Sequence, residues 1–337
     1  MKKLLIPAIF AFLAGCFHNP SAANTPGEYY DMFALVWEDY EANYPEFTLK
    51  DIDWKELFSH YSPLAEQAES TEELVMDVLL PMLTELKDVH IWFYRPDGTI
   101  MSTYLIDIEP NYDQTVLMEN YLWPNDFNGY VDNVGYCNPD SLPYLLINSW
   151  TITLNLERIR TFLELAADKP AVIIDIRMNS GGNNSLCGEV SGMFTSIACP
   201  AYYCRFRNGP GYDNVYYYPV TTYPDNEICY NGTVYLLIGE QSASSSEDFT
   251  LHMDNIENVV MIGDTTMGIG CCPNPLGLAD GWKVNTIIWS SWTTDYTPVE
   301  WNGIPPDIYV EATEEDFAQG IDPVLEYAIY LINSQPE

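Results

Sequence analysis

Short apolar runs alternate with amphipathic segments from about residue 140 onward, and this alternation constrains the fold more than any other feature of the chain. The run AVIIDI at 171–176 is apolar except for Asp175, as in strands that are buried on both faces of a sheet. Similar runs occur at 144–147, 234–238 and 259–262. Strands that alternate with helices form sheets with crossover helices, so the sequence predicts a layered α/β domain over residues 140–337.

The preceding part of the chain has a helical pattern. In residues 28–92 large apolar side chains recur three or four positions apart, which predicts a helical domain of three helices. The third helix opens with Ser70 and Glu73, the spacing of a capping box. Residues 93–139 contain Pro, Gly, Asn and Asp throughout, and we expect short strands and loops there.

Residues 1–15 have the features of an export signal. Two lysines precede a short apolar run, which ends in the series Leu-Ala-Gly-Cys at Cys16. This series resembles a bacterial lipobox, in which the cysteine is acylated and becomes the N-terminus. We therefore expect a lipoprotein signal peptide over 1–15, a tether over 16–27 and an exported protein anchored by Cys16 in the periplasm or cell envelope. The alternative is an ordinary signal peptide in which Cys16 is coincidental.

The formal net charge of −36 limits the partners of the chain. Nucleic acid is excluded as a natural partner, because its phosphates would be repelled. The charge either keeps the protein soluble or steers neutral and basic substrates toward it.

Seven cysteines follow Cys16, and export permits disulfides among them. An odd number leaves at least one thiol free or paired between chains, and the sequence does not give the pairing. Their spacing matches no zinc site, so we expect no metal there.

Four segments carry the residues that point to a function. They are LKDVH at 86–90, DIRMNSGG at 175–182, SASSSE at 242–247 and EWNGIPPD at 300–307. In order and spacing they resemble the motifs of the C-terminal-processing (tail-specific) serine peptidase family, and within it the tricorn-type subgroup. The resemblance implies a ClpP/crotonase-like core and hydrolysis of exported or unfolded proteins. It implies a polypeptide substrate and no metal or organic cofactor.

Ser244 is the candidate nucleophile. It lies between the predicted strand at 234–238 and a helix that runs to about residue 253. A helix N-terminus offers free N–H groups and a partial positive charge to a developing anion. The alternative is that the serines of 242–246 only cap this helix. The resemblance of the segment to the nucleophile turn of the family favours Ser244.

A serine hydroxyl needs a base, and the chain has four histidines. His18 lies in the tether, His60 belongs to no motif, and His252 is about two helical turns beyond Ser244. His90 stands where tricorn-type members carry their base. The resemblance therefore implies an acyl-enzyme on Ser244, with His90 moving the proton. An unperturbed histidine would give activity that rises with one ionisation at about pH 6 to 7.5.

The remaining site residues also follow from the resemblance. Gly181 and Gly182 come after a strand end, where backbone can approach a substrate, and with the N–H of Ser245 they are expected to form the oxyanion hole. The alternative for the two glycines is a plain left-handed turn. Glu300 matches the acidic residue that orients the histidine through a neighbouring hydroxyl. Since Val89 replaces that hydroxyl here, Glu300 acts directly, through water, or not at all.

The chain departs from the family in two further respects. Ile269 stands in the Gly-x-Gly turn where Ser–Lys members carry their lysine, and Ile269 cannot take a proton. Lys283 is the one lysine on a predicted core strand after the nucleophile, and it is the alternative base. Residues 93–139 are too few to hold the PDZ module of the family.

A second hypothesis is a non-catalytic binding module on the same fold, for apolar ligands or peptides. The many tyrosines and tryptophans of the chain suit such a ligand. The retained pair of Ser244 and His90 argues against it, because a binding protein needs neither as a reactive group.

Overall fold

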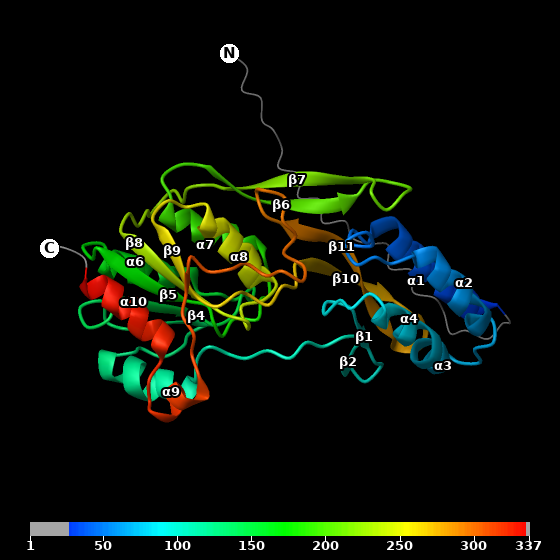
Figure 1. Ribbon diagram of the computed structural model, residues 1–337, viewed down its shortest axis with the longest axis horizontal. Helices are drawn as coiled ribbons and strands as arrows, with labels where there is room; N and C mark the ends of the chain where they lie inside the picture. Colours follow the sequence, from blue (N-terminus) through cyan, green and yellow to red (C-terminus); the bar gives the residue numbers. More distant parts are fainter. Residues whose placement is uncertain (1–26, 335–337) are drawn as a thin grey trace, which may run out of the picture.

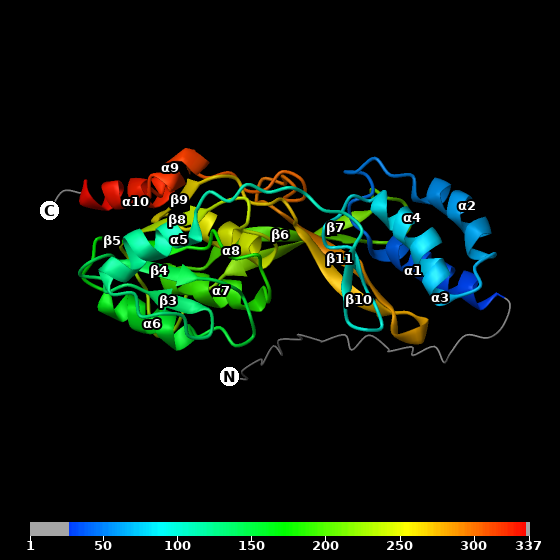
Figure 2. The ribbon, with the colours of Figure 1, turned by 90° about the horizontal axis from the view of Figure 1, so that it is seen from below.

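The computed structural model describes residues 27–334, which form two six-stranded sheets set end to end (Figures 1 and 2). The first sheet has the strand order β12-β9-β8-β5-β4-β3 and is parallel except for the edge strand β3. Its strands are β3 (Val134–Tyr136), β4 (Tyr144–Ile147), β5 (Ala171–Asp175), β8 (Thr233–Ile238), β9 (Val259–Gly263) and β12 (Ile308–Tyr309). We call it the parallel sheet.

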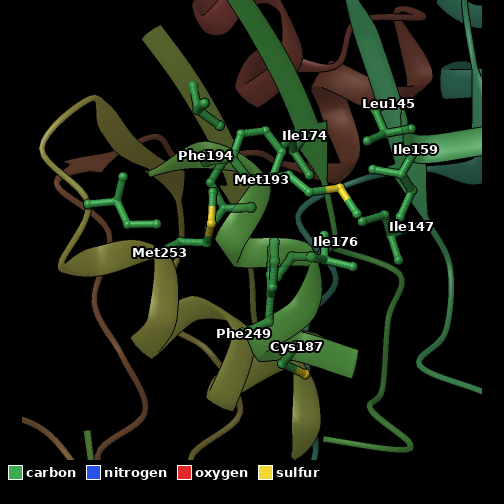
Figure 3. Packing of buried hydrophobic residues seen from close by; sticks show 14 of the residues in the cluster. Leu145, Ile147, Ile159, Ile174, Ile176, Cys187, Met193, Phe194, Phe249 and Met253 are labelled. Carbon is green, nitrogen blue, oxygen red and sulfur yellow. The ribbon is translucent and has the colours of Figure 1, made fainter. Parts of the chain in front are cut away.

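Both faces of the parallel sheet are covered, because its strands are apolar on both sides. Along β5, Val172 and Ile174 enter one core and Ala171 and Ile173 enter the other. The first core is closed by α6 (Leu156–Leu165), α7 (Ser185–Ser191) and α8 (Ser245–Asp254), and Figure 3 shows part of it. The second is closed by α10 (Pro323–Asn333) and by the helical segment at 114–125, while α9 (Glu314–Ala318) precedes α10.

The second sheet is antiparallel and has the order β2-β1-β11-β6-β7, with β10 also paired to β11. Its strands are β1 (Trp92–Tyr94), β2 (Ile100–Ser102), β6 (Cys199–Arg207), β7 (Val215–Thr222), β10 (Cys271–Gly277) and β11 (Lys283–Trp292). The strands β6 and β11 reach toward the parallel sheet (Figure 2). This antiparallel sheet therefore joins the two halves of the molecule.

The N-terminal helices pack on the antiparallel sheet. They are α1 (Glu28–Asn43), α2 (Trp54–Ala65) and a third helix built from α3 (Thr71–Glu73), a π-helical turn (Leu74–Leu79) and α4 (Leu80–Thr84). Ser70 caps the third helix, since its side chain accepts a hydrogen bond from the N–H of Glu73. Their apolar faces share one core with Val284 and Ile287 of β11.

The structure confirms the α/β fold class and the N-terminal helices. The bounds of the separate domains stay a prediction, because the helices share their core with strands from the later chain. Residues 93–139 hold more than the predicted short strands and loops. Asp113 caps a helical segment there, made of α5 (Gln114–Val116), a π-helical turn (Leu117–Leu122) and a 3-10 turn (Trp123–Asn125). This helical segment was not predicted, because its short apolar stripe, which begins at Leu117, lies among residues typical of loops.

The predicted signal peptide, the acylated Cys16 and most of the tether lie outside the described residues. Within residues 27–334, no helix combines the length and apolarity that a bilayer crossing requires. The seven cysteines in this range are all free thiols.

Candidate active site

Ser244 lies at a sharp turn between β8 and α8. Its backbone has φ of 54° and ψ of −119°, the region that the first central residue of a type II′ turn adopts and that favours glycine. A serine in this conformation is strained. The turn is held by Ser242, whose Oγ donates to the carbonyl of Ile176 at 3.0 Å. The half-buried Ser244 side chain is thereby presented above the end of the parallel sheet.

His90 reaches Ser244 from the other half of the molecule. Its Nε2 lies 3.1 Å from Ser244 Oγ, although 154 residues separate the two. His90 precedes β1, which pairs with β11 in the antiparallel sheet. The structure thus brings the two predicted residues within hydrogen-bond distance at the seam between the halves.

The surroundings of His90 favour a neutral imidazole. Burial lowers the pKa of His90 to about 4, with Lys50 lowering it further and Asp88 opposing both. A neutral ring can accept the proton of a hydroxyl. The backbone N–H of His90 donates to Asp88 Oδ1 at 2.9 Å, which fixes the start of the strand. The sequence-based expectation of an ionisation at about pH 6 to 7.5 assumed an unperturbed histidine, and burial lowers the pKa of His90 below that range.

Glu300 does not meet His90 through any hydrogen bond that the described residues show. Its Oε1 instead accepts from the ammonium of Lys50 at 2.5 Å. Lys50 also lies 3.3 Å from Asp88 Oδ2, and Asp88 in turn holds His90. Lys50, Asp88 and Glu300 form what we call the lysine relay. Lys50 lies in a turn between α1 and α2 and matches no motif, so sequence reasoning missed it.

The lysine relay is buried, and its charges balance one another in part. Burial alone would lower the pKa of Lys50, but Asp88 and Glu300 outweigh it and raise that pKa above its usual value. Burial works to raise the pKa of Asp88, while Lys50, His90 and the hydrogen bonds from His90 and Tyr44 hold it below its usual value. Burial and the charge of Asp88 raise the pKa of Glu300 in spite of Lys50. Lys50 is therefore the permanent cation of the group.

Three potential metal ligands meet at this point. Oxygen atoms of Asp88 and Glu300 and the sulfur of Cys271 lie within 4.8 Å of one another. The ammonium of Lys50 already bonds to both carboxylates. It supplies the positive charge that a metal ion would bring, so the group is better explained as an ion-pair network than as a metal site.

The two glycines after β5 lie against the nucleophile turn. Gly181 has φ of 105°, and a Cβ there would stand 2.8 Å from Ala243 O and 2.8 Å from Ser244 Cβ. Gly182 has φ of 140°, and a Cβ there would meet Trp150 O at 2.3 Å. Only glycine fits either position. The N–H of Gly181 donates to Asn179 Oδ1 at 3.0 Å, so it is already engaged.

Glu247 joins the nucleophile turn to the Gly-x-Gly turn, where the family pattern would place a lysine. Its Oε2 accepts from the N–H groups of Ser244 and Ile269, both at 3.0 Å. Its Oε1 accepts from Thr266 Oγ1 and the N–H of Gly268, both at 2.7 Å. Burial raises the pKa of Glu247 to about 7, against the opposing effect of these donors. From the sequence alone, Glu247 is only an acid in the first turn of a helix, where a negative charge favours the helix dipole.

Within residues 27–334, no hydrogen bond or ion pair joins the alternative base, Lys283, to Ser244, and Ile269 stands at the usual lysine position. Ile269 is buried and binds Glu247 through its backbone. Lys283 begins β11 opposite Tyr94 and is exposed, at the part of the antiparallel sheet that the N-terminal helices cover. His90 is the base candidate for which the structure records a contact with Ser244.

A cavity of about 160 Å³ opens beside Ser244. Gly182, Ser245 and Asp248 also line it. A substrate held there would lie between the nucleophile and the glycine turn.

Comparisons with known proteins place the chain beside known peptidases. The sequence model described as peptidase family S41 matches residues 142–310, and that of the tricorn protease C1 domain matches residues 26–84. The tricorn protease of Thermoplasma acidophilum is 27% identical over 161 residues, which are 47% of this chain and 14% of that protein. The chain therefore matches only a small part of the length of this relative.

Solved structures share the fold. A candidate peptidase from Parabacteroides merdae superposes with a TM-score of 0.79 at 24% identity, covering 94% of this chain and 100% of that one. The photosystem II D1 C-terminal processing protease gives a TM-score of 0.58 at 14% identity, covering 84% and 93%. Both similarities extend over nearly the whole described chain, so the two halves belong to one fold.

Proposed function

The chain belongs to peptidase family S41, and from this premise we propose that it is a serine peptidase with Ser244 as its nucleophile. The observation that carries the proposal is the 3.1 Å contact between Ser244 Oγ and His90 Nε2. It joins a strained serine at a strand–turn–helix corner to a base whose neutral form is favoured. Both features are typical of an activated nucleophile.

The proposed reaction has two halves. Ser244 Oγ attacks the peptide carbonyl while His90 Nε2 takes its proton, and the tetrahedral adduct collapses to an acyl-enzyme as His90 returns the proton to the leaving amine. Water then attacks the ester, with His90 as base again, and releases the acid and free Ser244. The protein's own groups therefore suffice for the proton transfers.

We assign the oxyanion hole to the N–H groups of Gly182 and Ser245. Ser245 is the first residue of α8, where the N–H has no partner within the helix. The N–H of Gly181 is engaged by Asn179, so Gly181 contributes space instead. Its missing Cβ lets the glycine turn approach Ser244.

Glu300 acts on His90 through the lysine relay in this proposal. The relay runs from Glu300 Oε1 to Lys50, from Lys50 to Asp88, and from Asp88 to the backbone N–H of His90. Lys50 and Asp88 take the place of the bridging hydroxyl that Val89 lacks. Glu300, Lys50 and Asp88 are thus positioning residues, because none of them touches the reacting atoms.

The substrate class and the location are part of the proposal. We expect exported or unfolded polypeptides, reached by a protein anchored through an acyl group on Cys16. Mass spectrometry of the N-terminal peptide from membrane-extracted protein tests the anchor. An unmodified terminus beyond Cys16 would contradict it.

A fluorophosphonate probe tests the peptidase directly. The parent should be labelled on Ser244 and should degrade unfolded casein, and Ser244→Ala should do neither while remaining folded by circular dichroism. His90→Ala should lose about a hundredfold or more in turnover, the usual effect of removing a general base. His60→Ala is the matched control, since His60 is exposed on α2, and it should keep full activity. A folded parent that neither labels nor cleaves would favour the binding module.

A further inference from the structure

The cavity beside Ser244 has a buried acid in its wall. Asp248 lies in the first turn of α8, four residues after Ser244, which stands at the N-cap of this helix. Asp248 is only 5% exposed, and it lines the cavity together with Ser244. A buried carboxylate and the nucleophile therefore line the same cavity.

Asp248 is held in place by neutral groups. Its Oδ1 accepts from Ser291 Oγ at 2.6 Å, and Asn184 also bonds to it. Both residues line the same cavity. Burial raises the pKa of Asp248 to about 6, so the group is mainly charged at neutral pH. None of the ion pairs within residues 27–334 includes Asp248, so this carboxylate has no cationic partner there.

Part of the remaining wall is apolar. Ile269, Pro273 and Trp289 line the cavity. Its volume of about 160 Å³ is close to that of cavities that hold a benzene ring. A long unbranched side chain can place its methylene groups against such walls and its charged end at the acid.

We propose that this cavity receives the side chain on the acyl side of the cleaved bond, and that Asp248 selects a basic residue there, lysine or arginine. The proposal rests on the peptidase function of Ser244 argued above. The substrate carbonyl lies at Ser244, so the side chain next to it enters the adjoining cavity and reaches Asp248 one turn further along α8. The formal net charge of −36 acts in the same direction, because it raises the local concentration of basic polypeptides.

Peptide substrates that differ at this one position test the proposal. Lysine, arginine, norleucine and glutamate are compared, with norleucine matching the lysine stem without its charge. We expect kcat/KM for lysine to exceed that for norleucine by about tenfold or more, and glutamate to be poorest. Asp248→Asn should lower the lysine value by about tenfold or more while leaving norleucine within about threefold, because the amide keeps the shape but not the charge.

Asp254→Asn is the matched control. Asp254 is exposed at the end of the same helix, so this variant removes one negative charge without touching the cavity. It should keep the preference for lysine over norleucine. A parent that prefers norleucine, or an unchanged ratio in folded Asp248→Asn, overturns the proposal.

Binding to the inactive Ser244→Ala variant separates the pocket from the catalysis. Product peptides ending in lysine should bind about tenfold more tightly than those ending in norleucine, and the difference should vanish in Ser244→Ala combined with Asp248→Asn. Selective binding without any hydrolysis by the parent would contradict the proposed peptidase function and support the proposed basic-residue pocket. Hydrolysis without a preference for lysine would contradict the proposed pocket and support the proposed peptidase function.

Discussion

The ammonium of Lys50 lies 2.5 Å from Oε1 of Glu300, and 250 residues separate the two in the chain. Both side chains are 1% exposed. The ring of Trp301 covers Lys50 from a distance of 5.1 Å. This ion pair therefore ties the turn after α1 to the segment that carries Glu300, next to the base of the proposed active site.

Lys50→Met should destabilise the protein strongly, because it leaves two buried carboxylates without their cation. We expect the free energy of unfolding to fall by about 3–5 kcal/mol, as when one partner of a buried pair is removed. Urea unfolding followed by tryptophan fluorescence measures this. The double variant Lys50→Met with Glu300→Gln should recover part of the loss, since one of the unpaired charges is gone. Equal midpoints for Lys50→Met and the parent would show that the pair adds no stability.

The imidazole of His90 should titrate with a midpoint at about pH 4, because burial disfavours its charged form. The Cε1–H signals of ¹³C-labelled histidine report this in the Ser244→Ala variant, with His90→Gln to assign the peak. Since the unfolded chain takes up the proton first, this group should also reduce stability as the pH falls from about 6.5 to about 4. A midpoint at about pH 6 to 7.5 would show that the ring is solvated and would restore the sequence-based expectation.

Ser244→Gly should be more stable than Ser244→Ala, although both should be inactive. The turn has φ of 54°, where glycine avoids the strain that any side chain incurs. We expect a difference of about 1 kcal/mol in the free energy of unfolding, after allowing for the greater freedom of glycine in the unfolded chain. Thermal unfolding of the two variants measures it, and Ser244→Ala should stay within a few degrees of the parent. If alanine proves the more stable, the turn is not strained.

Glu247→Gln should weaken both the fold and the activity. The amide nitrogen cannot accept, so two of the donors that now bind the carboxylate lose their partner. We expect a loss of about 1–3 kcal/mol in stability and about tenfold or more in kcat, because the nucleophile turn loses its anchor. Urea unfolding and turnover of one peptide measure the two effects. Glu257→Gln, at an exposed residue just after α8, should change neither. Full activity in Glu247→Gln would show that the clamp does not hold Ser244.

The strands of the parallel sheet could be predicted because their pattern is local. The run at 171–174 is apolar without interruption, and the sheet buries it on both faces. Ser244 and His90 could be named because they lie in short motifs, but their 3.1 Å contact could not be derived from residues 154 positions apart. That contact depends on how the two sheets are joined.

Lys50 and Asp248 show what a sequence does not reveal. Lys50 lies in a turn, where a lysine is ordinarily exposed, and only the folded chain shows the two carboxylates beside it. In the sequence, Asp248 is only an acid in the first turn of a predicted helix, where it favours the helix dipole. Its position four residues after Ser244 does not predict that both line a cavity between α8 and β11. The lowered pKa of His90 could not be predicted either, because it results from burial, and His90 is buried only when the two halves of the molecule pack together.

The positive φ of Ser244 has a consequence for how such a chain evolves. Glycine at this position would relax the turn, so a lineage with no use for the hydroxyl gains stability by losing it. Selection for the reactivity of the serine opposes that loss. The first mark of a descendant that has become a binding protein would therefore be glycine at this one corner, while the buried sheet, the helices and the lysine relay stayed as they are.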